Sequence, residues 1–389
     1  MLAPMRVIGL MSGTSADGVD AALVEWPDGA EPRPFELLAA REDPHEPGLQ
    51  QRIHALAAGE LDGPAVLAEV AALDTLLADR FADAAHAVAR DAGVVLAEVD
   101  AIASHGQTIA HHPEHAASLQ IGSPSRIAER TGIPVVGDFR ARDLAAGGQG
   151  APLAPFFHFA TFSEPGEARA ALNLGGIANV TWLPPSGDPD EVVAFDTGPA
   201  NSLIDGALHA ATSGEERFDR DGARALRGRV DGDLLAALLD DDYLRAPPPK
   251  STGRERYGRA EADRLAADWG ARELDDLIAT LTAFTVESVT RACRDHLPGL
   301  PQRLVVGGGG SRNPALMAGL GRALPGSAVA PFDALGVPSD AAEAMAFALL
   351  GRNTLLGLPN HLPRTTGAAR AAVLGVIAPG ADGRIGPIR

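Results

Sequence analysis

Short apolar runs and polar breaks alternate along the whole chain, and their spacing predicts strands interleaved with helices. Residues 6–11 and 19–26 are apolar runs joined by a polar turn, which predicts a strand hairpin. Apolar side chains then recur at helical spacing from residue 64 to residue 90, which is typical of one face of a long helix. Shorter runs predict further strands in this part of the chain, at residues 99–104 and 133–137.

A glycine- and proline-rich break at residues 145–155 precedes a second series of strand and helix signals. The apolar runs 170–174 and 177–183 flank a Gly-Gly pair, which favours a second hairpin. Mixed strands and helices of these lengths indicate an α/β protein. Because both series begin with a hairpin, we expect two similarly built domains, residues 1–140 and 141–389. The second series also predicts strands at 192–195 and 304–306 and helices at 201–211, 232–239, 261–269, 274–296, 314–324 and 340–350.

The composition excludes several classes of protein. The 389 residues carry a net charge of −18, and 46% of them are hydrophobic. An acidic surface repels a phosphate backbone and an anionic membrane, so we expect neither nucleic acid nor a membrane as a partner. Lys250 is the only lysine in the sequence, and it follows three prolines instead of the glycine-rich run of a P-loop. Since no apolar stretch reaches the roughly 20 residues of a membrane span, we expect a cytoplasmic protein.

The turn of the first hairpin carries residue types that bind phosphate. Its glycines let backbone N–H groups approach an anion closely, and its hydroxyls add donors. Asp17 and Asp20 would repel phosphate unless a divalent cation lay between them, so they indicate a Mg²⁺–phosphate site. A solvated hairpin with an Asx-turn is the alternative interpretation. The residues concerned are Ser12, Gly13, Thr14, Ser15, Ala16, Asp17, Gly18, Val19 and Asp20.

A second candidate site combines the Gly-Gly turn with an aspartate. Gly175 and Gly176 form the turn of the second hairpin, and Asp196 directly follows an apolar strand. The carboxyl ends of strands in open α/β sheets are where ligands collect, so Asp196 is expected at such an edge. Pro199 is expected to begin a helix whose N-terminal amides face the same place. An N-cap role for Thr197 is the alternative, but it does not explain the aspartate.

A third glycine-rich segment, Gly307 to Gly310, lies between a predicted strand and a predicted helix. Glycines leave the backbone bare, so a flat ligand such as a nucleotide base or a ribose can lie directly on it. A glycine run alone is weak support for a ligand site. Its position between a strand and a helix makes this segment a stronger candidate for the adenosine side of a nucleotide.

The three turns resemble those of the actin-like ATPase superfamily, which includes sugar kinases, acetate kinase and the heat-shock ATPase chaperones. Longer motifs narrow the resemblance to the anhydro-N-acetylmuramic acid kinase family of bacterial cell-wall recycling. Ala200 departs from that family's pattern, which usually has a glycine there. In chain order the motifs are Met-Ser-Gly-Thr-Ser-x-Asp-Gly-x-Asp (11–20), Ser-His-Gly-Gln-Thr (104–108), Gly-Asp-Phe-Arg (137–140), Asn-Leu-Gly-Gly-Ile-Ala-Asn (173–179), Asp-Thr-Gly-Pro-x-Asn (196–201), Pro-Pro-Lys-Ser-Thr-Gly-Arg-Glu (248–255) and Gly-Gly-Gly (307–309).

The resemblance implies two related actin-like (ribonuclease H-like) domains with ATP in a cleft between them. It also implies a kinase that opens the internal bridge of 1,6-anhydro-N-acetylmuramic acid with water and phosphorylates O6, giving N-acetylmuramate 6-phosphate and ADP. In this reading Asp196 is the catalytic base, Asp17 holds Mg²⁺, and Arg140 binds the lactyl carboxylate of the sugar. A homodimer is expected on the same basis.

The resemblance further divides the other candidate residues between the two substrates. Glu343 is expected to orient Asp196 or the sugar. Lys250 is expected to close the cleft or to contact phosphate, and a solvated loop lysine is the alternative. The residues expected to bind ATP are Gly13, Thr14, Ser15, Ala16, Asp17, Gly18, Val19, Asp20, Gly175, Gly176, Asn179, Gly307, Gly308, Gly309 and Asn313. Those expected to bind the sugar are Ser12, His105, Gln107, Thr108, Asp138, Arg140 and Glu343.

Two alternative functions share these motifs. One is a kinase of the same fold that acts on another sugar or on a carboxylate. The other is a non-catalytic, nucleotide-regulated binding protein in which ATP closes a clamp. No extended substrate-binding domain follows the expected ATPase core, and the motif at 104–108 would have no purpose in a clamp. We therefore favour the kinase.

Overall fold

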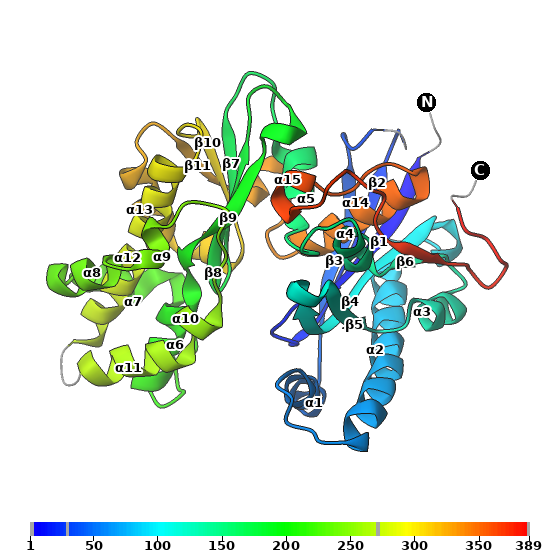
Figure 1. Cartoon of the computed structure of the whole chain (residues 1–389), viewed down its shortest axis with the longest axis horizontal. Coiled ribbons are helices and arrows are strands. Elements are labelled where there is room, and N and C mark those ends of the chain that lie inside the picture. The colour runs from blue at the N-terminus through cyan, green and yellow to red at the C-terminus, as the bar shows by residue number, and fades with distance from the viewer. Residues whose placement is uncertain (1–3, 29–30, 270–272, 387–389) are drawn as a thin grey trace. The chain divides into compact units, whose positions relative to one another are not determined.

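The computed structural model describes residues 4–28, 31–269 and 273–386 and divides into two compact units (Figure 1). The first unit comprises residues 1–161 and 340–389, and the second comprises residues 162–339. The units therefore divide the chain elsewhere than the expected boundary between residues 140 and 141. The outermost residues of the two expected domains, 1–3 and 387–389, lie outside the described residues.

The first unit is built on a mixed sheet. In the described part of the chain this sheet has seven strands in the order β12-β6-β4-β1-β2-β3, with β5 paired to β4. The pairs β1–β2, β2–β3, β4–β5 and β6–β12 are antiparallel, whereas β1–β4 and β4–β6 are parallel. The strands are β1 (Met5–Ser12), β2 (Gly18–Trp26), β3 (Glu36–Pro44), β4 (Ala101–His112), β5 (Ala117–Ile121), β6 (Val135–Gly137) and β12 (Val376–Ala378).

The C-terminal segment explains why the boundary differs from the expected one. Strand β12, drawn in red in Figure 1, lies beside β6 and closes the edge of the first sheet. The pairing joins Ile377 to Val136, residues that lie far apart in sequence. The helices of this unit are α1 (Pro47–Ala57), α2 (Pro64–Asp91), α3 (Pro124–Thr131), α4 (Phe139–Ala145), α5 (Ala154–Phe162), α14 (Ala342–Leu356) and α15 (Pro363–Thr366).

Two helices pack on opposite faces of the first sheet. Because side chains alternate along a strand, neighbouring residues of β1 face different helices. On one face Ile8 and Leu10 of β1 form a core with Leu73 and Phe81 of α2, all with essentially no exposure. On the other face α14 comes very close to β1. A Cβ at Gly9 would lie 1.8 Å from the carbonyl oxygen of Ala344. Glycine at this position therefore lets the backbones of the helix and the strand approach each other.

The second unit repeats the same strand order. Its sheet has five strands, within the described residues, in the order β11-β10-β7-β8-β9. In both sheets the first strand pairs antiparallel with the second and parallel with a later strand. This repetition confirms the predicted α/β class and the two similarly built domains. The strands are β7 (Arg169–Leu174), β8 (Ile177–Leu183), β9 (Val193–Pro199), β10 (Arg303–Gly307) and β11 (Ala328–Pro331).

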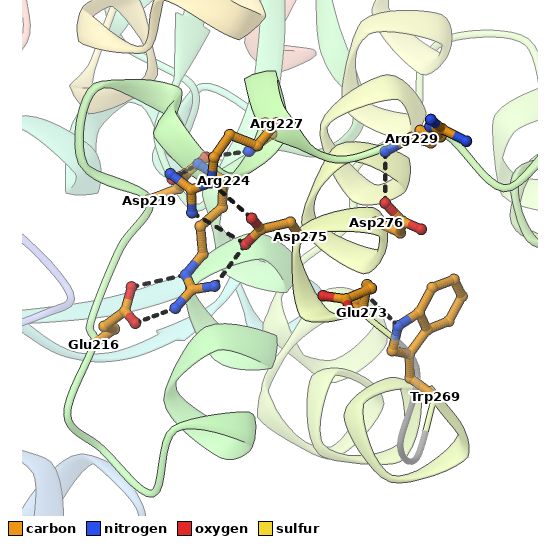
Figure 2. Close-up of polar contacts among 10 residues, drawn as sticks. Glu216, Asp219, Arg224, Arg227, Arg229, Trp269, Glu273, Asp275 and Asp276 are labelled. Carbon is orange, nitrogen blue, oxygen red and sulfur yellow. Dashed lines mark hydrogen bonds and ion pairs between the residues drawn. The ribbon is translucent and has the colours of Figure 1, made fainter.

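A helical layer completes the second unit. Figure 2 shows how charged residues fasten α7 to the start of α12. Asp275 accepts hydrogen bonds from Arg224 Nη1 at 2.6 Å and from Arg227 Nε at 2.8 Å. No helix in the described ranges is both long enough and apolar enough to cross a membrane. The helices are α6 (Asn201–Ala211), α7 (Ala223–Arg227), α8 (Gly232–Leu239), α9 (Asp242–Arg245), α10 (Arg254–Tyr257), α11 (Arg259–Trp269), α12 (Leu274–His296) and α13 (Pro314–Ala323).

Candidate active site

Side chains of β1 and β4 support the first hairpin turn, residues 13–17, through hydrogen bonds. Ser12 Oγ lies 2.6 Å from Gln107 Oε1 and 2.8 Å from the Gly18 carbonyl oxygen, and its proton can be donated to either. Gln107 Nε2 donates to the Gly13 carbonyl at 3.1 Å. Ser12 and Gln107 are each 1% exposed. Both residues therefore brace the turn, and a direct contact of either with sugar stays a prediction.

The segment around α1 holds the same turn from another side. Gln50 Nε2 and His54 Nε2 each lie 2.9 Å from the Ser15 carbonyl oxygen. The backbone N–H of His45 donates to the Asp17 carbonyl at 2.7 Å. Three carbonyls of the turn thus accept hydrogen bonds from the protein, which reduces the number of free oxygens that an approaching anion would meet. No motif in the sequence indicated this support.

Carboxylates crowd the first hairpin. Burial, together with the charges of Glu42, Glu343 and Asp17, raises the pKa of Asp20 to about 7. Glu42 lies directly opposite Asp20 in the β2–β3 pairing. Burial also raises the pKa of Glu343, and Asp17 adds to the effect while Arg140 opposes it. A cation placed here would relieve this repulsion, so the residue types fit Mg²⁺.

The geometry limits how a metal ion would be held. Within the described residues, no three His, Cys, Asp or Glu side chains are arranged to coordinate one ion. Asp17 itself is exposed and accepts a hydrogen bond from Ser15 Oγ at 2.8 Å. Mg²⁺ usually keeps several waters and takes one or two carboxylates together with substrate phosphates. The turn therefore suits an ion that arrives with a nucleotide rather than a resident one.

Arg140 and His105 form a fixed pair in the first unit. The imidazole Nδ1 donates to the Gly106 carbonyl at 2.9 Å, so Nε2 is the acceptor for the Arg140 guanidinium at 2.9 and 3.1 Å. Burial, with the charge of Arg140, lowers the pKa of His105 to about 3. Burial lowers the pKa of Arg140 to about 10, which leaves it charged at neutral pH. His105 therefore holds one edge of a charged guanidinium, whose other N–H groups suit a carboxylate ligand.

The remaining predicted sugar residues belong to the same unit as this pair. Thr108 accepts a hydrogen bond from Gln120 Nε2 at 3.2 Å, across the β4–β5 pairing. Asp138 is exposed at the start of α4, where its φ of 55° is in the left-handed region. Glu343 lies in the first turn of α14, close enough to Arg140 that the guanidinium charge opposes the rise in its pKa. The first unit thus brings together an arginine, a neutral histidine and several acceptors, which suits a polar, carboxylate-bearing ligand.

In the second unit the three predicted motifs meet in one row across the sheet. Gly307 of β10 is the register partner of Asn173 in β7, Asn173 is the partner of Asn179 in β8, and Asn179 is the partner of Asp196 in β9. Direct partners on neighbouring strands point to the same face of a sheet. The sequence placed Asp196 at the end of a strand. In the structure β9 continues to Pro199, so Asp196 lies within the strand and its row.

Asp196 is held by the segment that contains Lys250. The backbone N–H of Thr252 donates to Asp196 Oδ2 at 3.0 Å, and Tyr243 Oη donates to the Asp196 carbonyl at 2.7 Å. Burial raises the pKa of Asp196, the Thr252 hydrogen bond opposes this, and the charge of Glu255 adds to it. A carboxylate of this kind accepts a proton more readily than one in water. These contacts suit the general base expected from the sequence.

Lys250 is not a solvated loop lysine in this structure, and its expected contact with phosphate or role in closing the cleft stays a prediction. Its Nζ donates to the carbonyls of Tyr243 and Leu244, both at 3.1 Å. The ammonium also lies 4.9 Å from the centroid of the Tyr243 ring. Its backbone carbonyl accepts from the Asp196 N–H at 3.3 Å. The single lysine thus fastens the segment that holds Asp196.

The Gly175–Gly176 turn is tied to the start of α6. The N–H groups of Asn201 and Ser202 donate to the carbonyls of Gly175 and Gly176, at 3.0 and 3.1 Å. These amides are therefore already paired, and the expectation that they face a ligand is wrong. The helix begins at Asn201 after a non-helical Ala200, so neither Pro199 nor Thr197 has the expected role.

Ala200 replaces the family's glycine without an unpaired polar group. Its N–H donates to the Gly176 carbonyl at 2.9 Å, and its carbonyl accepts from Thr285 Oγ1 at 3.3 Å. Its methyl group is fully buried beside the second hairpin. The departure from the family pattern is therefore accommodated inside the core of the second unit.

The glycines of the third motif have different reasons to be glycine. A Cβ at Gly308 would lie 2.5 Å from Asn173 Oδ1, and one at Gly307 would lie 2.4 Å from the Phe332 ring. A Cβ at Gly309 would meet nothing within 4 Å. Gly309 is therefore the member of the run with open space above it. Asn313 caps α13 by accepting from the N–H of Ala315 at 2.9 Å, and its role in nucleotide binding stays a prediction.

Known proteins resemble this chain over nearly its whole length. Residues 5–380 match the family described as "Anhydro-N-acetylmuramic acid kinase". The proteins of that name from Gloeobacter violaceus and Streptomyces coelicolor are each 47% identical to this chain, covering 97% of it and 99% and 95% of their own lengths. The solved structure titled "Activator of the 2-Hydroxyisocaproyl-CoA Dehydratase from Clostridium difficile with bound ADPNP" covers 90% of this chain and 95% of its own at 11% identity; its TM-score of 0.43 is too low to support an argument.

A glycine-rich hairpin in each of two similarly built α/β units, with a partly buried carboxylate in the strand after the second hairpin, is typical of enzymes that handle phosphate. The matched family and the full-length relatives specify the class further. The chain belongs to the anhydro-N-acetylmuramic acid kinase family.

Proposed function

We propose that the protein is an ATP-dependent kinase that opens the bridge of 1,6-anhydro-N-acetylmuramic acid and phosphorylates O6, as a step of peptidoglycan recycling. The family match supports the substrate and the reaction class. The observation that carries the mechanism is the environment of Asp196. Burial raises the pKa of this carboxylate, and the Thr252 N–H holds the carboxylate in place. Such a group is suited to take a proton from water.

The reaction balances with Asp196 as the base. The oxygen of a water molecule forms a bond to C1 of the sugar, and the proton it loses goes to the Asp196 carboxylate. The C1–O6 bond breaks and its electron pair remains on O6, which attacks the γ-phosphorus of ATP. The bond between that phosphorus and the β,γ-bridging oxygen breaks, and ADP leaves with the electron pair. Asp196 later releases its proton to solvent.

The residues of the first unit supply binding and orientation in this proposal. Arg140 pairs with the lactyl carboxylate, because a guanidinium recognises a carboxylate with two parallel hydrogen bonds. His105 is neutral and holds the guanidinium in place. The turn at residues 13–17 and the turn at Gly175–Gly176 present backbone to the phosphates. When bound, Mg²⁺ near Asp17 neutralises phosphate charge.

Two parts of the proposal come from the family resemblance and from composition. A homodimer remains a prediction, and so does a cytoplasmic location. The rival kinase of another sugar or carboxylate uses the same residues to bind the nucleotide. It differs only in the substrate group that Arg140 binds. A non-catalytic clamp would have no use for a carboxylate with the raised pKa of Asp196.

Isotope labelling tests the proposal. The protein is incubated with Mg²⁺, ATP and 1,6-anhydro-N-acetylmuramic acid in ¹⁸O-water, and the product is analysed by mass spectrometry and NMR. We expect a 6-phosphate with ¹⁸O at C1. A phosphorylated product without the label would overturn the ring-opening mechanism. Absence of product, together with turnover of an ordinary hexose or of a carboxylate such as acetate, would favour the rival kinase.

A further inference from the structure

A fully buried carboxylate lies behind Arg140 in the first unit. Asp143, on α4, has no exposed surface. Its Oδ1 accepts from His361 Nδ1 at 2.6 Å and from Thr366 Oγ1 at 2.7 Å, and its Oδ2 accepts from the Gly150 N–H at 2.7 Å. Burial alone would raise the pKa of Asp143, but these hydrogen bonds outweigh it and lower the pKa. Asp143 is therefore charged, and both of its carboxylate oxygens accept hydrogen bonds.

The turn at residues 147–150 is folded around this carboxylate. The backbone N–H of Gly148 donates to the Asp143 carbonyl at 2.9 Å. A Cβ at Gly148 would lie 2.2 Å from Asp143 Oδ2, so the carboxylate occupies the place of a side chain. Gly150 has a φ of +72°, a conformation that favours glycine. The glycine-rich break seen in the sequence thus encloses the buried Asp143 carboxylate and is not a link between domains.

The same turn holds Arg140. The Gly150 carbonyl accepts from Arg140 Nη1 at 2.7 Å, while the Gly150 N–H is fixed by Asp143. On its other edge the guanidinium donates to His105 Nε2. Each of the three guanidinium nitrogens therefore donates to a fixed acceptor. The direction of the other two N–H groups depends on where Asp143 places Gly150.

The C-terminal segment completes the arrangement. His361 lies 218 residues from Asp143 along the chain, and its Nε2 accepts from the Ala372 N–H at 2.9 Å. Nδ1 must then carry the proton that goes to Asp143. The Gln149 N–H donates to the Thr366 carbonyl at 2.8 Å. A segment distant in sequence is thereby fastened to the turn that holds Arg140.

We propose that Asp143, together with His361 and Thr366, positions Arg140 for the carboxylate of the sugar substrate by fixing the Gly150 carbonyl. This inference rests on the proposed function, in which Arg140 binds that carboxylate. Asp143 does not touch substrate and acts through Arg140. Loss of its charge or of its partners lets the 147–150 turn shift, and the guanidinium shifts with it.

The first test replaces Asp143 with asparagine, which keeps the size but gives up one acceptor and the charge. Steady-state rates are measured with 1,6-anhydro-N-acetylmuramic acid, and binding of 1,6-anhydro-N-acetylglucosamine, which lacks the lactyl carboxylate, is measured by calorimetry. We expect D143N to raise the KM for the muramic sugar about tenfold, with kcat and the KM for ATP changed less than about threefold. Binding of the lactyl-free sugar should not change. Equal losses for both sugars would overturn the inference.

A double-mutant cycle separates action through Arg140 from a general loss of structure. R140K should raise the same KM, and D143N combined with R140K should add little to it, because both changes remove one interaction. Fully additive effects would contradict the inference. If wild-type protein does not turn over the muramic sugar at all, the proposed function fails, and this result is distinct from a wild-type enzyme whose D143N variant behaves normally.

A milder pair of variants decides the matter if D143N does not fold. T366V removes one donor to Asp143 and keeps the shape of the side chain. T365V is its matched control, because the neighbouring hydroxyl of Thr365 donates to the Leu362 carbonyl and not to Asp143. We expect T366V to raise the KM for the muramic sugar about threefold and T365V to leave it unchanged. The same KM in both variants would overturn the inference.

Discussion

The two glycine-rich hairpins occupy the same position in their sheets but are stabilised in different ways. The turn at residues 13–17 is held by side chains from β4 and α1, among them Gln107 and Gln50. The turn at Gly175–Gly176 is held by backbone N–H groups at the start of α6 and by the side chain of Asn201. Similar topology therefore does not imply similar support, and the first turn depends more on residues distant in sequence.

The two units also differ in their electrostatics. Carboxylates in the first unit repel one another, and the pKa of Asp20 reaches about 7. In the second unit Asp196 receives a hydrogen bond from the Thr252 N–H, and its pKa is raised by burial. The first arrangement suits a cation, whereas the second suits the base that we propose. Four substitutions test this comparison.

The largest effect is expected at Asp196. Asparagine has nearly the same shape but accepts a proton poorly, so D196N should lower kcat by about 10²- to 10⁴-fold. Nucleotide affinity should change little, because the phosphates are bound by backbone in this proposal. Rates from a coupled ADP assay and ATP affinity from calorimetry check the two halves of the prediction.

The matched control for this variant is D190N, which changes an exposed aspartate in the short 3₁₀ helix Pro189–Glu191 before β9. It should leave both kcat and ATP affinity as in the wild type. Loss of ATP binding in D196N, with D190N normal, would show that Asp196 serves the nucleotide instead of the water. The carboxylate of the second unit would then serve the nucleotide, as we propose for the first unit.

The next effect concerns the Thr252 N–H. Proline at this position removes the donor, so the pKa of Asp196 should rise further. A protonated Asp196 cannot act as a base, so activity falls as the pH drops through this pKa. T252P should therefore move the acid limb of the kcat/KM profile upward by about one pH unit. T252A keeps the N–H and should leave the limb in place; an equal shift in both variants would mean that the side chain, not the amide, controls Asp196.

Much of the fold could be predicted because local signals agreed with the tertiary structure. The helix expected at 64–90 is α2 (Pro64–Asp91), and Asn201–Ala211 and Leu274–His296 have the predicted bounds. Both hairpins were visible because apolar runs flank small, turn-forming residues. In these elements the apolar side chains that produce the sequence pattern are also the ones that pack in the core.

Other features depend on partners that no local pattern reveals. Strand β12 has only three residues, and it is a strand because β6 lies beside it. The 145–155 segment looked like a boundary because its glycines are frequent, but Gly148 is required by the buried carboxylate of Asp143 and Gly150 by its positive φ. Similarly, a sequence shows that Asn313 precedes a helix but does not separate a capping role from a ligand contact. These cases explain why the site residues were easier to find than their roles.

The first unit can be tested through stability. Burial and neighbouring carboxylates raise the pKa of Asp20 from the ordinary 3.8 to about 7 in the folded state, so the folded protein binds this proton more tightly than the unfolded chain. Stability is therefore lost as the pH rises from about 4 to 7, and D20N should avoid this loss. We expect D20N to raise the free energy of unfolding without nucleotide by about 1–2 kcal/mol at pH 8, after allowance for solvent screening.

Urea unfolding at pH 4 and pH 8 checks this prediction. The gain in D20N should be confined to the higher pH, where wild-type Asp20 is charged. E36Q is the control, since Glu36 is an exposed carboxylate at the start of β3 and its loss should change stability little at either pH. A D20N variant that is less stable than the wild type at pH 8 would contradict the view that the first unit is crowded with negative charge.

The smallest effect on folding is expected at Gly309, where the second unit leaves space that its own atoms do not fill. A Cβ there has no neighbour within 4 Å, so G309A should change the free energy of unfolding by less than about 0.5 kcal/mol. If adenosine lies on this backbone, the added methyl group should still raise the KM for ATP about threefold. G308A is the contrasting variant, because its φ of +74° and the nearby Asn173 Oδ1 should make it destabilising whether or not ATP binds. Unchanged ATP kinetics in G309A would mean that the open space above Gly309 is not where the nucleotide lies.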